Sequence, residues 1–297
     1  MKNKKTLKGI IFAFLGGSCW GISGTCGQYV FTKSTIDPGA LTAIRMLFSG
    51  ILLLGYCFIK EKKNLVFVWK EKKDAVWLLV YTLAGLVFIQ YSYLTAIHYS
   101  NSGTATTIQY TGIVMIMFVS CLIEKRKPVI KEITAAVLAL SGIFVLATHG
   151  KISTLVLSPP GLIWGLLAAV ALTSYTILPT NLIKKWGTFL INGIGMFLGG
   201  ILLSLVFTIW KKNWEYSLDI WLAIIGVVII GTLVATCLYS QGVAQAGSVK
   251  ASLAACVEPL VASLTSACWL HTNFTSIDIL GFVIIMLSVI IANKSHG

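Results

Sequence analysis

Apolar segments long enough to cross a membrane follow one another along almost the whole chain. A helix needs about 20 apolar residues to span a bilayer, and ten segments of roughly this length are separated by short polar turns. We expect the spans at residues 9–30, 39–59, 75–97, 102–122, 132–149, 161–182, 188–210, 219–241, 249–270 and 277–292. Because ten spans use nearly all of the 297 residues, no room is left for a soluble domain. The sequence predicts an all-α membrane protein with ten transmembrane helices.

The composition agrees with a membrane protein and argues against a nucleic-acid-binding one. The chain is 57% hydrophobic and 11% charged, with a mean hydropathy of +0.87, whereas soluble domains are about 45–50% apolar and about 25% charged. The net charge is +13, but the basic residues cluster at the ends of apolar segments and form no basic face interleaved with aromatic residues. We therefore interpret these clusters as topology signals and expect no nucleic-acid partner.

The distribution of Lys and Arg predicts the orientation of the chain. With the N-terminus inside, eighteen basic residues fall on the inner side and four on the outer side, while Arg45 lies within the second span. Cytoplasmic loops carry an excess of Lys and Arg. We therefore expect both termini in the cytoplasm and a multi-pass protein of a bacterial plasma membrane.

Ten spans divide into two halves of five, residues 1–150 and 151–297, which enter the membrane from opposite sides. Residues 93–147 and 239–293 align at an offset of about 146, with Ser102 opposite Ser248 and Ala105 opposite Ala251. Inverted repeats with a site at their interface near the midplane are a transporter design. Chance similarity between apolar helices is the alternative explanation.

Glu258 is the acidic residue that lies deepest inside an apolar segment, and Pro259 follows it directly. A charged side chain at bilayer depth costs at least about 2.5–3.5 kcal/mol on insertion scales. The proline removes one helix hydrogen bond and frees a backbone carbonyl. A deep acid beside a helix break is typical of a solute pathway, where Glu258 would bind a cationic group of the solute or carry a coupling proton. The alternative is a structural carboxylate.

Other polar residues in the spans are candidates for binding a solute. Arg45 suits a solute carboxylate, but a structural role, tying helix ends or lipid phosphate, is favoured over it, and Lys250 could meet an anionic solute group or extend to the headgroups. Apolar walls with a few polar groups line solute cavities, although packing or interface anchoring also explains each such residue. The remaining candidates are Trp20, Gln90, Tyr91, Gln109, Tyr110, Tyr175, Tyr239 and Gln241.

We expect no metal site and no cofactor. All seven cysteines lie in apolar segments without a CxxC pair, and the histidines lack metal-binding spacing. No Gly-rich phosphate loop is present, so ATP is not expected to drive the protein directly.

Several short patterns resemble those of the drug/metabolite transporter superfamily, in particular of EamA-like transporters, over nearly all of the chain. They are Gly16-Gly-Ser-Cys-Trp20-Gly21, Ala43-Ile-Arg45-Met-Leu, Gln109-Tyr110 with Glu124, and the segment from Ala251 to Ala262 around Glu258-Pro259. The chain departs from the family at Ile113, where proline is frequent, so Gly112 would supply the flexibility there. Another departure is at Leu270 or His271, opposite Glu124. The resemblance implies two five-helix repeats, a central cavity, alternating access and export of a metabolite, often an amino acid.

The sequence therefore predicts a secondary transporter of a small organic metabolite, not an enzyme, whose partners are the solute and the lipid bilayer. A monomer has enough helices to enclose a cavity, and a dimer is not excluded. A phosphorylated or nucleotide-linked solute is the first alternative, which requires several buried cations. A membrane enzyme acting on a lipid-linked substrate is the second, which requires a cluster of His, Asp or Cys near one membrane face.

Overall fold

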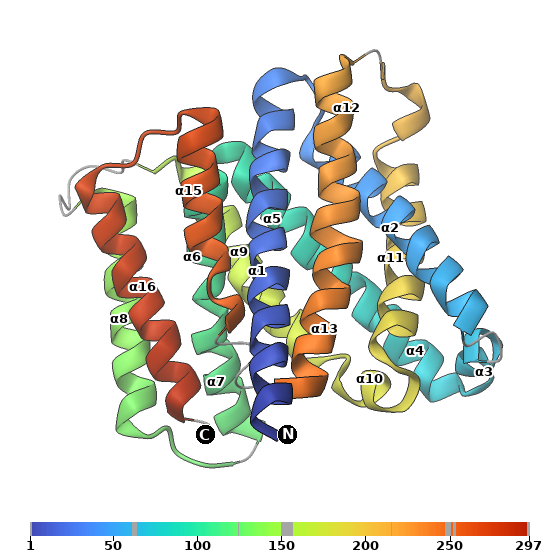
Figure 1. The fold of residues 1–297 in the computed structure, drawn as a ribbon, viewed down its shortest axis with the longest axis horizontal. Coiled ribbons are helices and arrows are strands. Elements are labelled where there is room, and N and C mark those ends of the chain that lie inside the picture. Colours follow the sequence, from blue (N-terminus) through green and yellow to red (C-terminus); the bar gives the residue numbers. More distant parts are fainter. Residues whose placement is uncertain are drawn as a thin grey trace.

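The computed structural model is a helical bundle in which some helices run roughly upright in Figure 1 and others are inclined to them. It describes residues 2–60, 64–123, 125–149, 157–214, 216–246, 251 and 254–295. Within these ranges the chain forms helices joined by turns, without any strand. The predicted all-α fold class is confirmed for this part of the chain.

Helices of the first half are α1 (Lys2–Lys33), α2 (Pro38–Lys60), α3 (Asn64–Lys70), α4 (Lys72–Tyr81), η1 (Thr82–Val87), α5 (Phe88–Tyr99), α6 (Ser102–Tyr110), α7 (Gly112–Ile123) and α8 (Ile130–Thr148). Those of the second half are α9 (Pro159–Ile177), α10 (Thr180–Trp186), α11 (Thr188–Val206), η2 (Ile209–Lys211), α12 (Leu218–Ile225), η3 (Gly226–Val234), α13 (Ala235–Ala246), α15 (Glu258–Leu270) and α16 (Ser276–Ser295). In Figure 1, α1, α8, α11, α12, α15 and α16 run roughly upright, while α2, α4, α5 and α9 are inclined to them.

Eight helical segments of the described chain are long and apolar enough to cross a membrane. In three of them, consecutive elements form one crossing: α4 to α5, α6 to α7, and α12 to α13. At the last two expected spans, α15 has 13 residues and the apolar part of α16 covers Ser276–Ile291. The count of ten spans therefore stays a prediction.

Two crossings contain a π-helical segment at matching places. Segment η1 contains Gly85 and segment η3 contains Gly231, and these glycines are separated by the same offset of about 146 that aligns the two halves. π-Helical turns are rare and frequently occur at functional sites.

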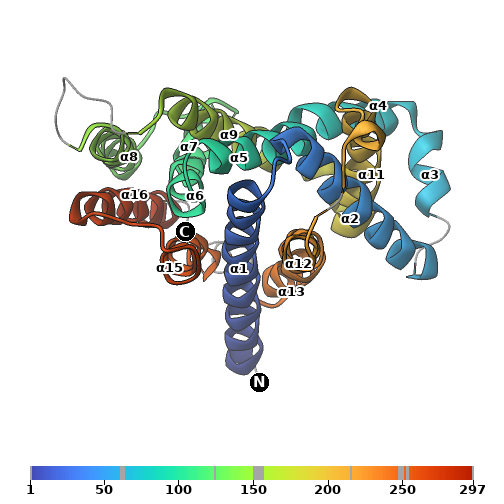
Figure 2. The same ribbon diagram turned by 90° about the horizontal axis from the view of Figure 1, so that it is seen from above.

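Helix α1 runs through the middle of the bundle, between α15 on one side and η3 and α13 on the other (Figure 1 and Figure 2). Glycines permit this approach, because a Cβ atom at Gly17 would lie 2.7 Å from the Ala255 carbonyl oxygen and one at Gly21 would lie 2.8 Å from the Glu258 carbonyl oxygen. At the two ends of the bundle, α8 packs on α16 and α2 packs on α11.

Buried apolar side chains fill the space between these helices. One cluster, around Val30, Leu41 and Leu94, joins α1, α2 and α5 to α12, and another, around Met46 and Leu190, joins α2 to α11. In Figure 1 the start of α1 and the end of α16 lie on the same side of the bundle. Which side faces the cytoplasm stays a prediction.

Candidate functional site

Glu258 lies in the interior, at the first residue of α15, with 8% of its surface exposed. The hydroxyl of Tyr110, the last residue of α6, donates a hydrogen bond of 2.8 Å to its Oε2 atom. The two residues are 148 positions apart and belong to different halves of the chain. The contact therefore brings together two of the predicted site residues.

The same region contains a break in the helix of the expected ninth span. The turn at residues 256–257 precedes α15, and Pro259 has no N–H to donate to the carbonyl four residues earlier, that of Ala255. The Tyr110 hydroxyl also lies 3.1 Å from this carbonyl oxygen. In the fourth crossing, the chain is interrupted at Thr111, between α6 and α7 and beside Gly112.

Arg45 lies in α2 and is 6% exposed. Its Nε donates to the Thr232 hydroxyl at 3.2 Å and its Nη2 to the Gly231 carbonyl at 3.5 Å, both in η3. Among the described residues, neither Arg45 nor Glu258 takes part in any ion pair. Both residues adjoin the same stretch of α1, where Gly21 meets the Glu258 carbonyl and Ser23 meets Gly231, the partner of Arg45. A buried basic group and a buried acidic group thus lie beside the same part of α1 without an ion pair between them in the described residues.

Gln109 has an unsatisfied polar atom in this region. The side chain is 8% exposed, and its Oε1 is buried without a hydrogen-bond partner in the described part of the protein. Thr106, three residues earlier on the same face of α6, shares a hydrogen bond of 2.8 Å with the Tyr93 hydroxyl. Because a buried acceptor without a partner is costly, Gln109 is suited to accept a hydrogen bond from a ligand.

The other predicted site residues in the described chain make aromatic contacts. Trp20 and Tyr239 pack together with their ring centroids 5.1 Å apart, and Tyr175 lies 6.0 Å from Tyr81. Tyr91 contacts a different aromatic group, at 5.3 Å from Trp164 and 5.6 Å from Phe207. Lys250 and Glu124 lie outside the described residues.

The sequence profile of one protein family matches the chain twice, over residues 7–148 and over residues 159–294. The chain belongs to the EamA-like transporter family. This family is part of the drug/metabolite transporter superfamily, so the predicted resemblance is confirmed and the protein is a multi-pass membrane transporter.

Relatives over nearly the full length agree with this family. The chain is 35% identical over 286 residues to a Salmonella typhimurium protein named "Uncharacterized inner membrane transporter YicL", covering 96% of this chain and 95% of the relative. It is 24% identical over 256 residues to an "Uncharacterized transporter" of Archaeoglobus fulgidus, covering 86% and 87% of the two chains. A solved structure titled "Crystal structure of protein" shares the fold, with a TM-score of 0.64, 17% identity and coverage of 98% and 97%.

This EamA-like transporter also contains polar contacts that the sequence did not single out. The Tyr81 hydroxyl donates to Asn192 Oδ1 at 2.8 Å, and both side chains are buried. Near the C-terminal end of α1, Gln28 accepts from the Ser102 N–H and the Ser266 hydroxyl, each at 2.8 Å. Asn192 and Gln28 are uncharged amides within apolar segments, which is the signal that could have drawn attention to them.

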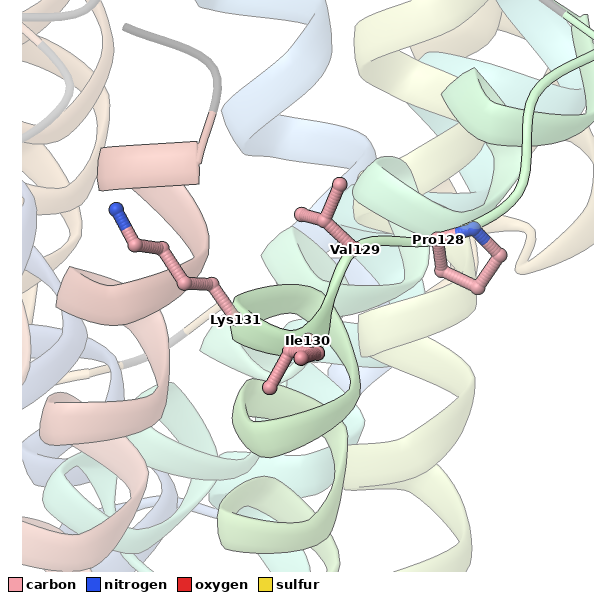
Figure 3. A pocket seen from close by; sticks show the side chains of 4 residues that line it. All are labelled: Pro128, Val129, Ile130 and Lys131. Atoms are coloured by element: carbon pink, nitrogen blue, oxygen red, sulfur yellow. The ribbon is translucent and has the colours of Figure 1, made fainter.

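Two hollows in the transporter lie away from these residues. The first, of about 580 Å³, is formed by Pro128, Val129, Ile130 and Lys131 at the start of α8 (Figure 3). The second, of about 380 Å³, lies between α7 and α9 and includes Met115 and Thr173. Neither is lined by Glu258, Tyr110 or Arg45, so neither changes the choice of candidate site.

Proposed function

We propose that this protein is a secondary transporter that exports a small zwitterionic metabolite, in the first place an amino acid or a related compound. The observation that carries the proposal is the pair of buried, opposite charges at Arg45 and Glu258. A zwitterion has a carboxylate for the guanidinium and an ammonium group for the carboxylate. Gln109 Oε1 would accept a further hydrogen bond from the solute.

Electrostatics favours such a solute at this site. Removing an isolated charge from water is costly unless it is paired and hydrogen-bonded. Among the described residues, Arg45 has only a hydroxyl and a carbonyl as partners, and Glu258 accepts from a single phenol. A solute with both charges would supply an opposite charge to Arg45 and to Glu258 at once, whereas an uncharged solute would supply neither.

Alternating access would follow from two inverted five-helix repeats, residues 1–150 and 151–297. Contacts between the halves are reciprocal: α1 packs on η3, α13 and α15, while α9 packs on η1, α5, α6 and α7. At the offset of about 146, η1 corresponds to η3, α5 to α13 and α7 to α15, so these contacts of α9 match those of α1, while the counterpart of α6 lies mostly outside the described residues. Together with the matching π-helical segments, the reciprocity supports ten crossings in two related halves that rock about the site.

Glu258 would also couple the movement to protons. A carboxylate in the interior is stabilised by an opposite charge and destabilised by burial, so the presence or absence of a cationic solute group changes its affinity for a proton. Export would then exchange the solute for a proton at the same residue.

Efflux from liposomes tests the proposal. Liposomes with the purified protein are loaded with a mixed pool of amino acids and small metabolites, a pH gradient is imposed, and the released compounds are identified by mass spectrometry. We expect selective release of zwitterions, strongly reduced by Glu258→Gln and by Arg45→Gln but retained by Glu71→Gln, which changes an exposed acid.

Other outcomes would contradict the proposal in recognisable ways. Release of phosphate esters alone would favour a phosphorylated or nucleotide-linked solute. Chemical conversion of a lipid-linked compound would indicate an enzyme. Normal release by Glu258→Gln at every pH gradient would exclude proton coupling through this residue.

A further inference from the structure

The Tyr110 hydroxyl lies between two acceptors that compete for its single proton. It is 2.8 Å from Glu258 Oε2 and 3.1 Å from the Ala255 carbonyl oxygen. A phenol donates one hydrogen bond at a time, although it can also accept. Tyr110 is 8% exposed, so water has little access to take the place of either partner.

The Ala255 carbonyl needs this donor because of Pro259. In an unbroken α-helix the N–H of residue 259 would donate to the carbonyl of residue 255, but proline has no N–H. Burial makes an unpaired backbone carbonyl unfavourable, and Ala255 is 5% exposed. The hydroxyl of a different helix, α6, is therefore in position to replace the missing backbone donor.

The protonation state of Glu258 decides which acceptor the hydroxyl serves. Ionised Glu258 can only accept, so Tyr110 donates to it and leaves the carbonyl. Protonated Glu258 has its own O–H, which can donate to the Tyr110 oxygen, so the Tyr110 proton becomes free for the carbonyl. The proton that Glu258 gains or loses is exchanged with the water on the side that the site faces, and Tyr110 keeps its own proton and only turns.

We propose that Tyr110 is a positioning residue that transmits the protonation of Glu258 to the helix break at Ala255–Pro259. Protonation closes the break with a hydrogen bond from α6, and ionisation releases it. The proposal rests on the proposed function, since it supplies the link between proton exchange and movement of the two halves.

A movement of the Ala255 carbonyl would act on α1, because the two are in close contact. A Cβ atom at Gly17 would lie 2.7 Å from the Ala255 carbonyl oxygen, so a shift of the carbonyl moves atoms that touch α1. In the described part of the chain, the charged and titratable groups beside Glu258 are Arg45 from α2, Tyr93 from α5 and the neighbouring Cys256, and Tyr239 from α13 is beside Tyr110. On α1, the residues closest to Ala255 and Glu258 include Gly17 and Gly21, which have no titratable side chain. Arg45 and Tyr93 make their own hydrogen bonds elsewhere, and the Tyr110 hydroxyl is within hydrogen-bond distance of both the acid and the Ala255 carbonyl.

Infrared spectroscopy of the complete protein in lipid bilayers tests the switch without any solute. The pH is varied, the carboxyl band of Glu258 is identified by its loss in Glu258→Gln, and the phenol band of Tyr110 by its loss in Tyr110→Phe. We expect the two bands to change together at one midpoint, and the phenol band to be independent of pH in Glu258→Gln. A phenol band that stays constant while Glu258 titrates would overturn the proposal.

A double-mutant cycle tests the second acceptor separately. Pro259→Ala supplies the missing N–H, so at acidic pH Tyr110→Phe should lower the melting temperature clearly less in the Pro259→Ala background than in the wild type. Tyr99→Phe, at an exposed phenol, should act equally in both backgrounds. Equal losses for Tyr110→Phe in both backgrounds would show that Tyr110 does not serve the carbonyl.

These readouts separate the switch from transport itself. Linked bands and a positive cycle in a protein that releases no solute would refute the proposed function and retain the switch. Selective, proton-coupled efflux from a protein whose phenol band does not respond to pH would support the proposed function and refute the switch.

Discussion

Adding one methyl group at Gly17 tests how closely α1 must approach the break before α15. A Cβ atom there would lie 2.7 Å from the Ala255 carbonyl oxygen and 2.9 Å from its Cα atom, whereas ordinary contact begins at about 3.4 Å. The helices would have to separate by about 0.7 Å. Both neighbours are backbone atoms, so no side-chain rotation can relieve the contact.

Gly55→Ala is the matched control, because a Cβ atom at Gly55 meets nothing within 4 Å. Both glycines lie in long helices, so each alanine gains a similar helix preference, about 1 kcal/mol in water, and the gain cancels when the variants are compared. Overpacking costs about 1–3 kcal/mol. We therefore expect Gly17→Ala to be less stable than Gly55→Ala by about 1–3 kcal/mol.

Unfolding of the purified variants in detergent micelles measures this difference, and efflux from liposomes measures its effect on transport. We expect Gly17→Ala to unfold earlier and to transport more slowly than Gly55→Ala, which should be at least as stable as the wild type and should transport at the wild-type rate. Equal stability of the two variants would refute the close approach of α1 to Ala255.

Three other perturbations have defined outcomes. Arg45→Gln should reduce transport of carboxylate-containing solutes by about 10- to 100-fold, the equivalent of a charged hydrogen bond, while Lys212→Gln, at a half-exposed residue, should leave it unchanged. Glu132→Ala should lower the free energy of unfolding by about 1.5–3 kcal/mol, because Glu132 is buried and accepts from both terminal nitrogens of Arg126 at 2.8 and 2.9 Å, and a melting curve will show it. Burial raises the pKa of Asp37, but the hydrogen bond and charge of Lys212 and the backbone N–H donors lower it by more, so the pKa lies below its ordinary value. The Asp37–Lys212 pair therefore stabilises the fold above the ordinary Asp pKa of about 3.9, and this contribution is lost as the pH falls below that value. The melting temperature should fall with acid for this reason, and Asp37→Asn should remove this part of the pH dependence.

Much of the helix pattern was accessible from the sequence because apolar length alone identifies a crossing. Eight of the expected segments satisfy this test in the described chain. The π-helical segments around Gly85 and Gly231 were not predicted, because a single extra residue per turn leaves an apolar segment looking the same. The break at Ala255–Pro259 was predicted, since proline marks it directly.

Candidate site residues could be chosen from the sequence, but their contacts could not. Glu258 and Tyr110 were both chosen as unusual polar groups, but they are 148 residues apart, and one sequence contains no information about such a pairing. The partners of Arg45, at Gly231 and Thr232, are ordinary residues of an apolar segment. Tyr91 matched the same pattern as Tyr110 yet packs in another aromatic group, because helical spacing does not show which face points inward.

Access to Gln109 from the two sides of the membrane most directly tests whether the site between the halves opens to each side in turn. Gln109→Cys, in a chain whose seven native cysteines are replaced, is exposed to a membrane-impermeant thiol reagent in right-side-out and in inside-out vesicles. Alternating access predicts labelling from both sides, slowed by a transported zwitterion and with a side preference that changes when the pH gradient is reversed. Labelling from one side only, whatever the gradient or solute, would contradict a site between the halves that opens to each side in turn.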